Sequence, residues 1–160
     1  MPTFTQIGTA QVVGAGGAAS IDFTSIPNTY TDLCVLYSVR GNTLEGIYVQ
    51  FNSSTSNFTG RYIYSDAGTP VSGILARYLG SINNSANSFT NGSLYITNYA
   101  ASTNKAFSID EVYDQPTTAG NMNFTSGLWS SSSAITSIKI EAAGGLTQHS
   151  TAYLYGVSNA

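Results

Sequence analysis

The stretch "IDFTSIPNTYTDLCVLYSVRG", residues 21–41, decides the fold class because it holds two alternating runs around a turn. From Leu33 to Val39, apolar side chains occupy every second position, which is the period of a strand with one buried face. The Pro-Asn pair at residues 27–28 is typical of a turn between two strands. We therefore predict two strands of a sandwich, with Val39 in the core and Arg40 at the strand end, facing solvent or a neighbour.

The same period of two recurs along the chain, while the helical period is absent. The runs are rich in the β-branched and aromatic residues that strands prefer. Turn residues such as Gly, Asn and Pro separate them, so we expect about eight to ten short strands. This pattern predicts one all-β domain over residues 1–160, a jelly-roll-like antiparallel β-sandwich. The further alternating runs cover residues 46–52, 61–66, 92–99, 105–113, 134–142 and 150–157.

Composition favours a neutral surface suited to assembly. The 160 residues are 42% hydrophobic but only 8% charged, which is about a third of the usual charged share. Because Lys and Glu are depleted at protein interfaces, a surface poor in charge suits a chain packed against others. The net charge is −3 and the five Lys and Arg residues are scattered. Nucleic-acid binding, which depends on a basic patch, is therefore not expected.

The N-terminal sequence "MPTFTQIGTA" lacks the basic and apolar regions of a signal peptide. No apolar run approaches the roughly 18 residues of a membrane helix. We therefore expect synthesis in a host cytoplasm and no membrane partner. Cys34 is the single cysteine, so no internal disulfide is expected, and its apolar surroundings predict a small buried side chain.

No motif predicts an enzyme or a cofactor. The G-x-G-x-x-A pattern at residues 14–19 needs a following helix to hold a dinucleotide, but an alternating strand run follows it. His149 is the only histidine, and the chain has no G-x-S-x-G nucleophile motif. We predict that this chain is not an enzyme and has no cofactor.

Three carboxylates lie close together in "SIDEVYD", residues 108–114. In a strand, Asp110 and Asp114 share one face and Glu111 lies on the other. Two interpretations stay open at this point. The carboxylates either contribute oxygens to a Ca²⁺ site or form a solvated strand edge and turn.

Tyrosines are the strongest binding signal in the sequence. Eleven tyrosines are too many for the deep core of one domain, although half-buried strand positions would accommodate some of them. Rigid amphipathic rings suit protein interfaces and sugar stacking. The candidate interface residues are Tyr95, Tyr99, Tyr153, Tyr155, Trp129 and Arg40.

Five segments are distributed along nearly the whole chain: "TQIGTAQVVGAGGAASIDFTSIPNTYTDL", "VQFNSSTSNFTGRYIY", "LYITNYAASTNKAFSIDEV", "GLWSSSSAITSIKIEAAGG" and "QHSTAYLYGV". With these segments the chain resembles a family of small β-rich virion proteins of tailed phages of the marine and cyanobacterial type. None of the shared segments is catalytic. The resemblance implies a jelly-roll-like fold and assembly on a virion, as a capsid decoration (cement) protein or as part of a tail or fibre.

These observations lead to one principal hypothesis and one alternative. The principal hypothesis is a structural virion protein on the capsid surface, bound to the major capsid protein and to itself as a dimer or trimer. Binding only the mature shell would stabilise that shell. An N-terminal arm over residues 1–11 is the expected contact with the shell. The alternative is a tail or fibre module that recognises host-surface glycans through tyrosines and Trp129.

Overall fold

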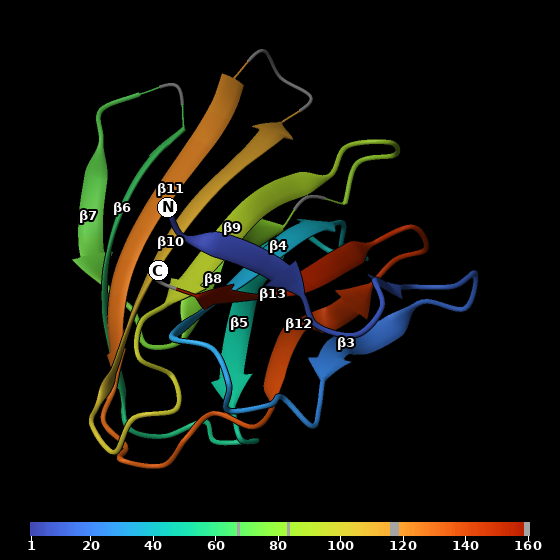
Figure 1. The fold of residues 1–160 in the computed structure, drawn as a ribbon. Helices are drawn as coiled ribbons and strands as arrows, with labels where there is room; N and C mark the ends of the chain where they lie inside the picture. The colour runs from blue at the N-terminus through green and yellow to red at the C-terminus, as the bar shows by residue number, and fades with distance from the viewer. Residues whose placement is uncertain (67, 83, 116–118, 159–160) are drawn as a thin grey trace.

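The computed structural model describes residues 1–66, 68–82, 84–115 and 119–158, and all of their regular structure is β (Figure 1). Two antiparallel sheets face each other around one hydrophobic core, so the predicted all-β sandwich is confirmed. The finer expectation of a jelly roll stays a prediction. Within the described ranges there is no helix long and apolar enough to cross a membrane.

The larger sheet has nine strands among the described residues. Its order is β1-β13-β4-β9-β10-β11-β6-β7, and the short β2 also pairs with β13. Strands β9, β10 and β11 follow one another as a meander with antiparallel pairing. The strands are β1 (Thr3–Gln6), β2 (Gln11–Val12), β4 (Asp32–Val39), β6 (Phe58–Asp66), β7 (Val71–Ile74), β9 (Thr90–Ile96), β10 (Lys105–Gln115), β11 (Ala119–Trp129) and β13 (Thr151–Ser158).

The smaller sheet has four strands in the described ranges and covers one face of the larger one (Figure 1). Its order is β3-β12-β5-β8, and β8 lies against β10 and β11 of the large sheet. We call the face of the large sheet that meets the small sheet the inner face, and the opposite side the outer face. The strands are β3 (Ala18–Phe23), β5 (Glu45–Phe51), β8 (Tyr78–Ile82) and β12 (Ile138–Leu146).

The alternating runs place their apolar sides in the core between the sheets, as predicted. Val39 is fully buried, and so are the other inward positions of β4. At one end, Phe51 of β5 meets Trp129 of β11 edge to face at 5.7 Å between ring centroids. Residues 21–41 cross from one sheet to the other, since β3 lies in the small sheet and β4 in the large one. The hydroxyl of Tyr99 donates to the backbone oxygen of Pro27 and so holds this connection in place.

The N-terminal residues are part of the large sheet. β1 pairs with β13 over Thr3–Gln6, and Gln11 and Val12 pair with Ala152 and Thr151. The segment predicted as an arm over residues 1–11 therefore lies along the edge of β13, although the side chains of β1 are exposed. After β2, a turn at residues 14–17 leads into β3, so the glycine pattern there is followed by a strand. Gly17 has a φ of +71°, which glycine adopts without strain.

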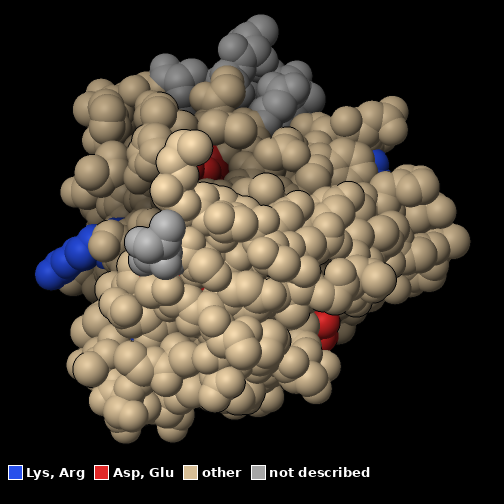
Figure 2. Space-filling view, in the orientation of Figure 1, with Lys and Arg blue, Asp and Glu red and all other residues tan. Residues whose placement is uncertain are grey.

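The surface carries few charges, as the composition indicates. Figure 2 shows one face on which only a few charged side chains interrupt neutral residues. Two ion pairs are present in the described part of the chain, Arg77 with Glu141 and Lys139 with Asp22. Arg77, in the turn before β8, reaches across β5 to Glu141 of β12, while Lys139 of β12 pairs with Asp22 of the neighbouring strand β3, so both ion pairs belong to the small sheet.

Candidate functional site

Five tyrosines meet in one open cleft where the two sheets separate beside β7. The cleft has a volume of about 410 Å³, within the usual range of small-molecule sites of roughly 300–1,000 Å³. We call it the tyrosine cleft. It is lined by Tyr48 of β5, Tyr62 and Tyr64 of β6, Tyr78 of β8 and Tyr113 of β10, together with Leu44, Glu45, Gly46, Leu75 and Ser81.

Four of these rings form a continuous series of contacts from the large sheet to the small one. Tyr62 lies 5.8 Å from both Tyr64 and Tyr78, between ring centroids. Tyr78 in turn lies 6.0 Å from Tyr48 in an edge-to-face contact. Such contacts fix ring orientation, so the aromatic wall is preformed.

Two glycines and one arginine hold the rings of Tyr48 and Tyr62 in place. A Cβ atom at Gly46 would lie 2.8 Å from the hydroxyl oxygen of Tyr48, and one at Gly73 would lie 2.5 Å from that of Tyr62. The absence of a side chain at Gly46 and Gly73 thus lets each ring lie across the neighbouring backbone. The Arg77 guanidinium lies 5.4 Å from the centre of the Tyr48 ring and pairs with Glu141 at 3.0 Å.

A buried carboxyl group lies directly behind the cleft. Glu111 of β10 is 2% exposed and accepts hydrogen bonds from the hydroxyl of Tyr37 at 3.1 Å and from the backbone N–H of Ser81 at 2.8 Å. Burial raises the pKa of Glu111 to about 8, against the effect of these two hydrogen bonds. Ser81 also shares a 2.7 Å hydrogen bond with the hydroxyl of Tyr78. The buried acid is therefore one residue removed from the cleft wall.

Strand β11 turns its polar residues inward beside this carboxyl group. Asn121, Asn123 and Thr125 are buried, whereas their neighbours Met122 and Phe124 are 45% and 51% exposed. The Asn123 amide donates to the backbone oxygen of Leu79 at 2.8 Å. Among the described residues, neither side-chain atom of Asn121 has a hydrogen-bond partner. An unpaired buried amide lowers the free energy of unfolding. Asn121 therefore departs from the rule that buried polar groups are hydrogen-bonded.

The reversal of β11 also creates an apolar patch on the outer face of the large sheet. Phe124 is paired in register with Ile63 of β6, and Met122 with Val112 of β10. Ile74 of the edge strand β7 is exposed on the same face, where it pairs in register with Arg61 of β6. We call these five side chains the outer apolar patch. Contiguous exposed apolar side chains of this kind mark interaction surfaces.

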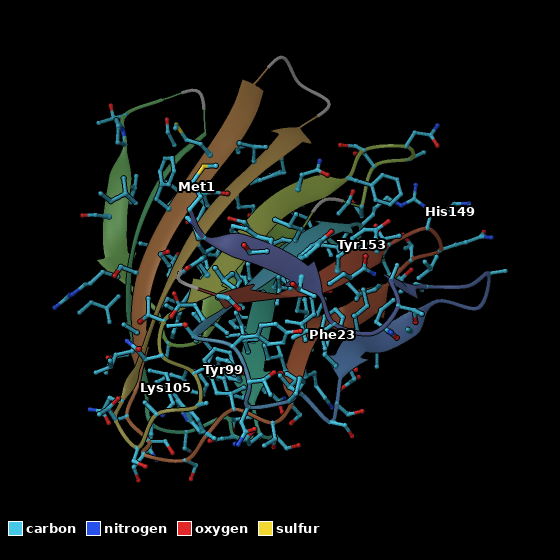
Figure 3. All side chains as sticks on the ribbon, viewed as in Figure 1. Met1, Phe23, Tyr99, Lys105, His149 and Tyr153 are labelled. Carbon is cyan, nitrogen blue, oxygen red and sulfur yellow. The ribbon has the colours of Figure 1, made fainter. Side chains whose placement is uncertain are left out.

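The predicted interface residues divide into two groups. Tyr95 and Tyr155 are half-buried on the outer face, and Tyr153 is exposed there (Figure 3). Cys34 lies between Tyr95 and Tyr155 in the strand register and is buried, as predicted. Burial raises the pKa of the Cys34 thiol to about 11, so it is not a reactive nucleophile.

The other predicted interface residues do not form part of an open surface. Tyr99 is fully buried beneath the Pro27 connection, and Trp129 is 4% exposed within the aromatic cluster. The prediction that Tyr99 and Trp129 contact a partner or a glycan therefore conflicts with their place in the core. Arg40 is half-buried and donates to Thr147 at 2.8 Å, with its guanidinium over the Phe89 ring.

The carboxylates of β10 are separated by the sheet. Asp110 is exposed on the outer face and accepts from Ser93 at 3.1 Å, while Glu111 is buried on the inner face. The interpretation of a solvated edge is thus wrong for Glu111. The side chain of Asp114 lies outside the described residues, and no group of metal-ligating side chains is found among the described ones. His149 is exposed in the turn before β13 (Figure 3).

Sequence patterns contained part of the signal for this site. Glu111 follows Phe107 and Ile109 at the same period, which already placed it on the buried side of the run. No run was predicted over β11, because a pattern of polar inside and apolar outside gives no indication of which side is buried. Comparison with protein-family models, curated proteins and solved structures found no match to this chain.

Proposed function

We propose that this chain is a structural virion protein of a tailed phage that decorates and stabilises the capsid. The resemblance of the sequence to small β-rich virion proteins motivates the phage assignment. The observation that best supports assembly on a partner is the outer apolar patch around Phe124 and Met122. Exposing a large apolar side chain to water is unfavourable in free energy, and a partner that covers the side chain removes this unfavourable contribution.

The surroundings of the patch suit a protein partner. Phe124 pairs in register with Asp110, whose carboxylate is held by the hydroxyl of Ser93. Arg61, exposed on the same face, pairs in register with Ile74, and arginine is among the residues enriched at protein interfaces. The partner we propose is the major capsid protein, with self-association into a dimer or trimer on the shell.

The first test is quantitative mass spectrometry of purified particles, measured as copies of this chain per copy of the major capsid protein. A fixed ratio near a simple fraction of the shell is the expected result, because particle symmetry sets the number of sites. A handful of copies per particle would place the chain in the tail and overturn the capsid proposal.

The second test assigns the docking face. Phe124→Asp places a charge in the outer apolar patch and should weaken binding to particles lacking this protein by roughly tenfold or more. Leu36→Asp is the matched control, since Leu36 is an exposed apolar residue on the same outer face but on β4. Equal binding by the two variants would show that the patch is not the docking surface.

A further inference from the structure

We propose that the tyrosine cleft is a binding site for a neutral saccharide. The inference does not depend on capsid decoration, because the cleft opens at the inner face and the outer apolar patch lies on the opposite side of the same strands. It concerns side chains that the interface prediction did not include, chiefly Tyr48, Tyr62 and Tyr78.

The aromatic wall of the tyrosine cleft is continuous and rigid. The rings of Tyr64, Tyr62, Tyr78 and Tyr48 touch in sequence across the gap between the sheets. Gly46 and Gly73 leave room for the rings of Tyr48 and Tyr62, and the Arg77 guanidinium lies over the Tyr48 ring. A ligand that stacks on this wall finds it already ordered, which lowers the entropic cost of binding.

The lining of the tyrosine cleft carries little charge. Glu45 is the only charged side chain among the described residues that line the cleft. Its carboxylate is engaged by the hydroxyl of Thr43 at 3.0 Å and by the backbone N–H of Gly144 at 2.6 Å. A phosphate-bearing ligand would need a cation here, because phosphate contacts dominate nucleic-acid affinity. A neutral ligand therefore suits the lining better than a nucleotide does.

The tyrosine cleft combines aromatic faces with hydroxyl groups. Burial raises the pKa of Tyr78 to about 12, so its hydroxyl stays neutral and both donates and accepts hydrogen bonds. Ser81 adds a second hydroxyl 2.7 Å away. Tyrosine presents an apolar ring with a polar tip, and a pyranose presents an apolar CH face with hydroxyls around it.

An unpaired amide lies next to the tyrosine cleft on the inner face. Asn121 is 2% exposed and pairs in register with Tyr113, which lines the cleft. Among the described residues its amide nitrogen and oxygen have no partners. A buried polar group without a partner calls for an explanation, and a ligand or an ordered water that satisfies it is one.

The test uses the intact 16.8 kDa chain and a panel of neutral gluco-, manno- and galacto-oligosaccharides. Binding is measured by saturation-transfer NMR and by titration calorimetry. We expect at least one series to bind, with transfer to the CH face of the sugar. Tyr62→Ala removes the central ring and should weaken binding about tenfold. Tyr153→Ala, an exposed tyrosine on the outer face, should leave affinity unchanged.

The absence of binding by every oligosaccharide at millimolar concentration would overturn the inference. Equal affinity of the Tyr62→Ala and Tyr153→Ala variants would overturn it as well. Preferential binding of single-stranded nucleic acid would also reject a neutral saccharide. Amide chemical-shift mapping on the unmodified protein needs no substitution: shifts at β5, β6 and β8 support the site, and shifts at β9 and β13 contradict it.

Discussion

Glu111 is a carboxylic acid held inside the sandwich, and its protonation couples stability to pH. Its pKa rises from 4.5 to about 8 on folding, chiefly through burial. Between these values the folded state holds a proton that the unfolded chain releases. The free energy of unfolding should therefore be highest below pH 4.5 with respect to this group, and fall as pH rises toward 8. The slope is roughly 1.4 kcal/mol per pH unit.

Glu111→Gln should abolish this slope, because the amide resembles the protonated acid and does not titrate. Urea unfolding at pH 5, 6.5 and 8 measures it for both proteins. Asp110→Asn, one residue away on the outer face, is the control that should keep the slope of the original protein. If the original protein has equal stability at pH 5 and pH 8, Glu111 does not bind a proton on folding.

Gly92 makes room for the hydroxyl group that contacts Glu111. A Cβ atom there would overlap the Tyr37 ring and lie 2.8 Å from the backbone oxygen of Asp110. Since Tyr37 is buried and hydrogen-bonded, it cannot move away easily. Gly92→Ala should lower the free energy of unfolding by about 1–3 kcal/mol, as overpacking does. The control is Gly16→Ala, because a Cβ atom at Gly16 meets open space. The melting temperatures of the two variants are compared by thermal unfolding. Equal melting temperatures would contradict the steric argument.

At the scale of strands, prediction succeeded where one side of a strand is apolar and failed where that pattern is reversed. The positions on β5 alternate cleanly, and the inward side of β4 from Leu33 to Val39 also follows from the sequence, although Cys34 on its other side is buried too. In β11, Met122 and Phe124 face outward and Asn121 and Asn123 face inward. Only the pairing of β11 between β6 and β10 determines this orientation, and strand pairing is a tertiary property that local periodicity does not contain.

The polar side of β11 should cost stability at Asn121 more than at Asn123. Asn121→Leu removes an amide without partners from the described interior and should raise the free energy of unfolding by about 1–3 kcal/mol. Asn123→Leu is the matched variant, because it also loses the 2.8 Å hydrogen bond to Leu79 and leaves that carbonyl unpaired. Denaturant midpoints should therefore rise for Asn121→Leu and not for Asn123→Leu. A fall in the Asn121→Leu midpoint would mean that a partner satisfies this amide.

For the whole molecule, the sandwich separates two kinds of surface on the same strands. β11 presents amide and hydroxyl groups on the inner face, at Asn121, Asn123 and Thr125, and apolar side chains on the outer face, at Met122 and Phe124. A chain that needed only to fold would place these residues the other way round. The two proposed partners, a protein on the outer face and a small ligand in the tyrosine cleft, would therefore occupy opposite sides of the same strands.

Strand β1 covers one edge of the large sheet beside β13. β1 pairs with β13 over Thr3–Gln6, but its own side chains are exposed. Deleting residues 1–6 should therefore leave the cooperative unfolding transition in place, with a loss of no more than a few kcal/mol from the ladder hydrogen bonds. It also leaves the backbone of β13 unpaired from Tyr155 to Ser158, an open edge that invites pairing between copies.

Size-exclusion chromatography with light scattering and circular dichroism test this deletion. We expect an unchanged β spectrum together with concentration-dependent self-association that the full chain does not show to the same degree. Phe4→Ser in the full chain is the control, since it removes an exposed side chain but keeps the strand pairing. If the deletion instead unfolds the protein, β1 is essential to the sandwich. If the deleted protein behaves as the full chain does, the β13 edge needs no cover.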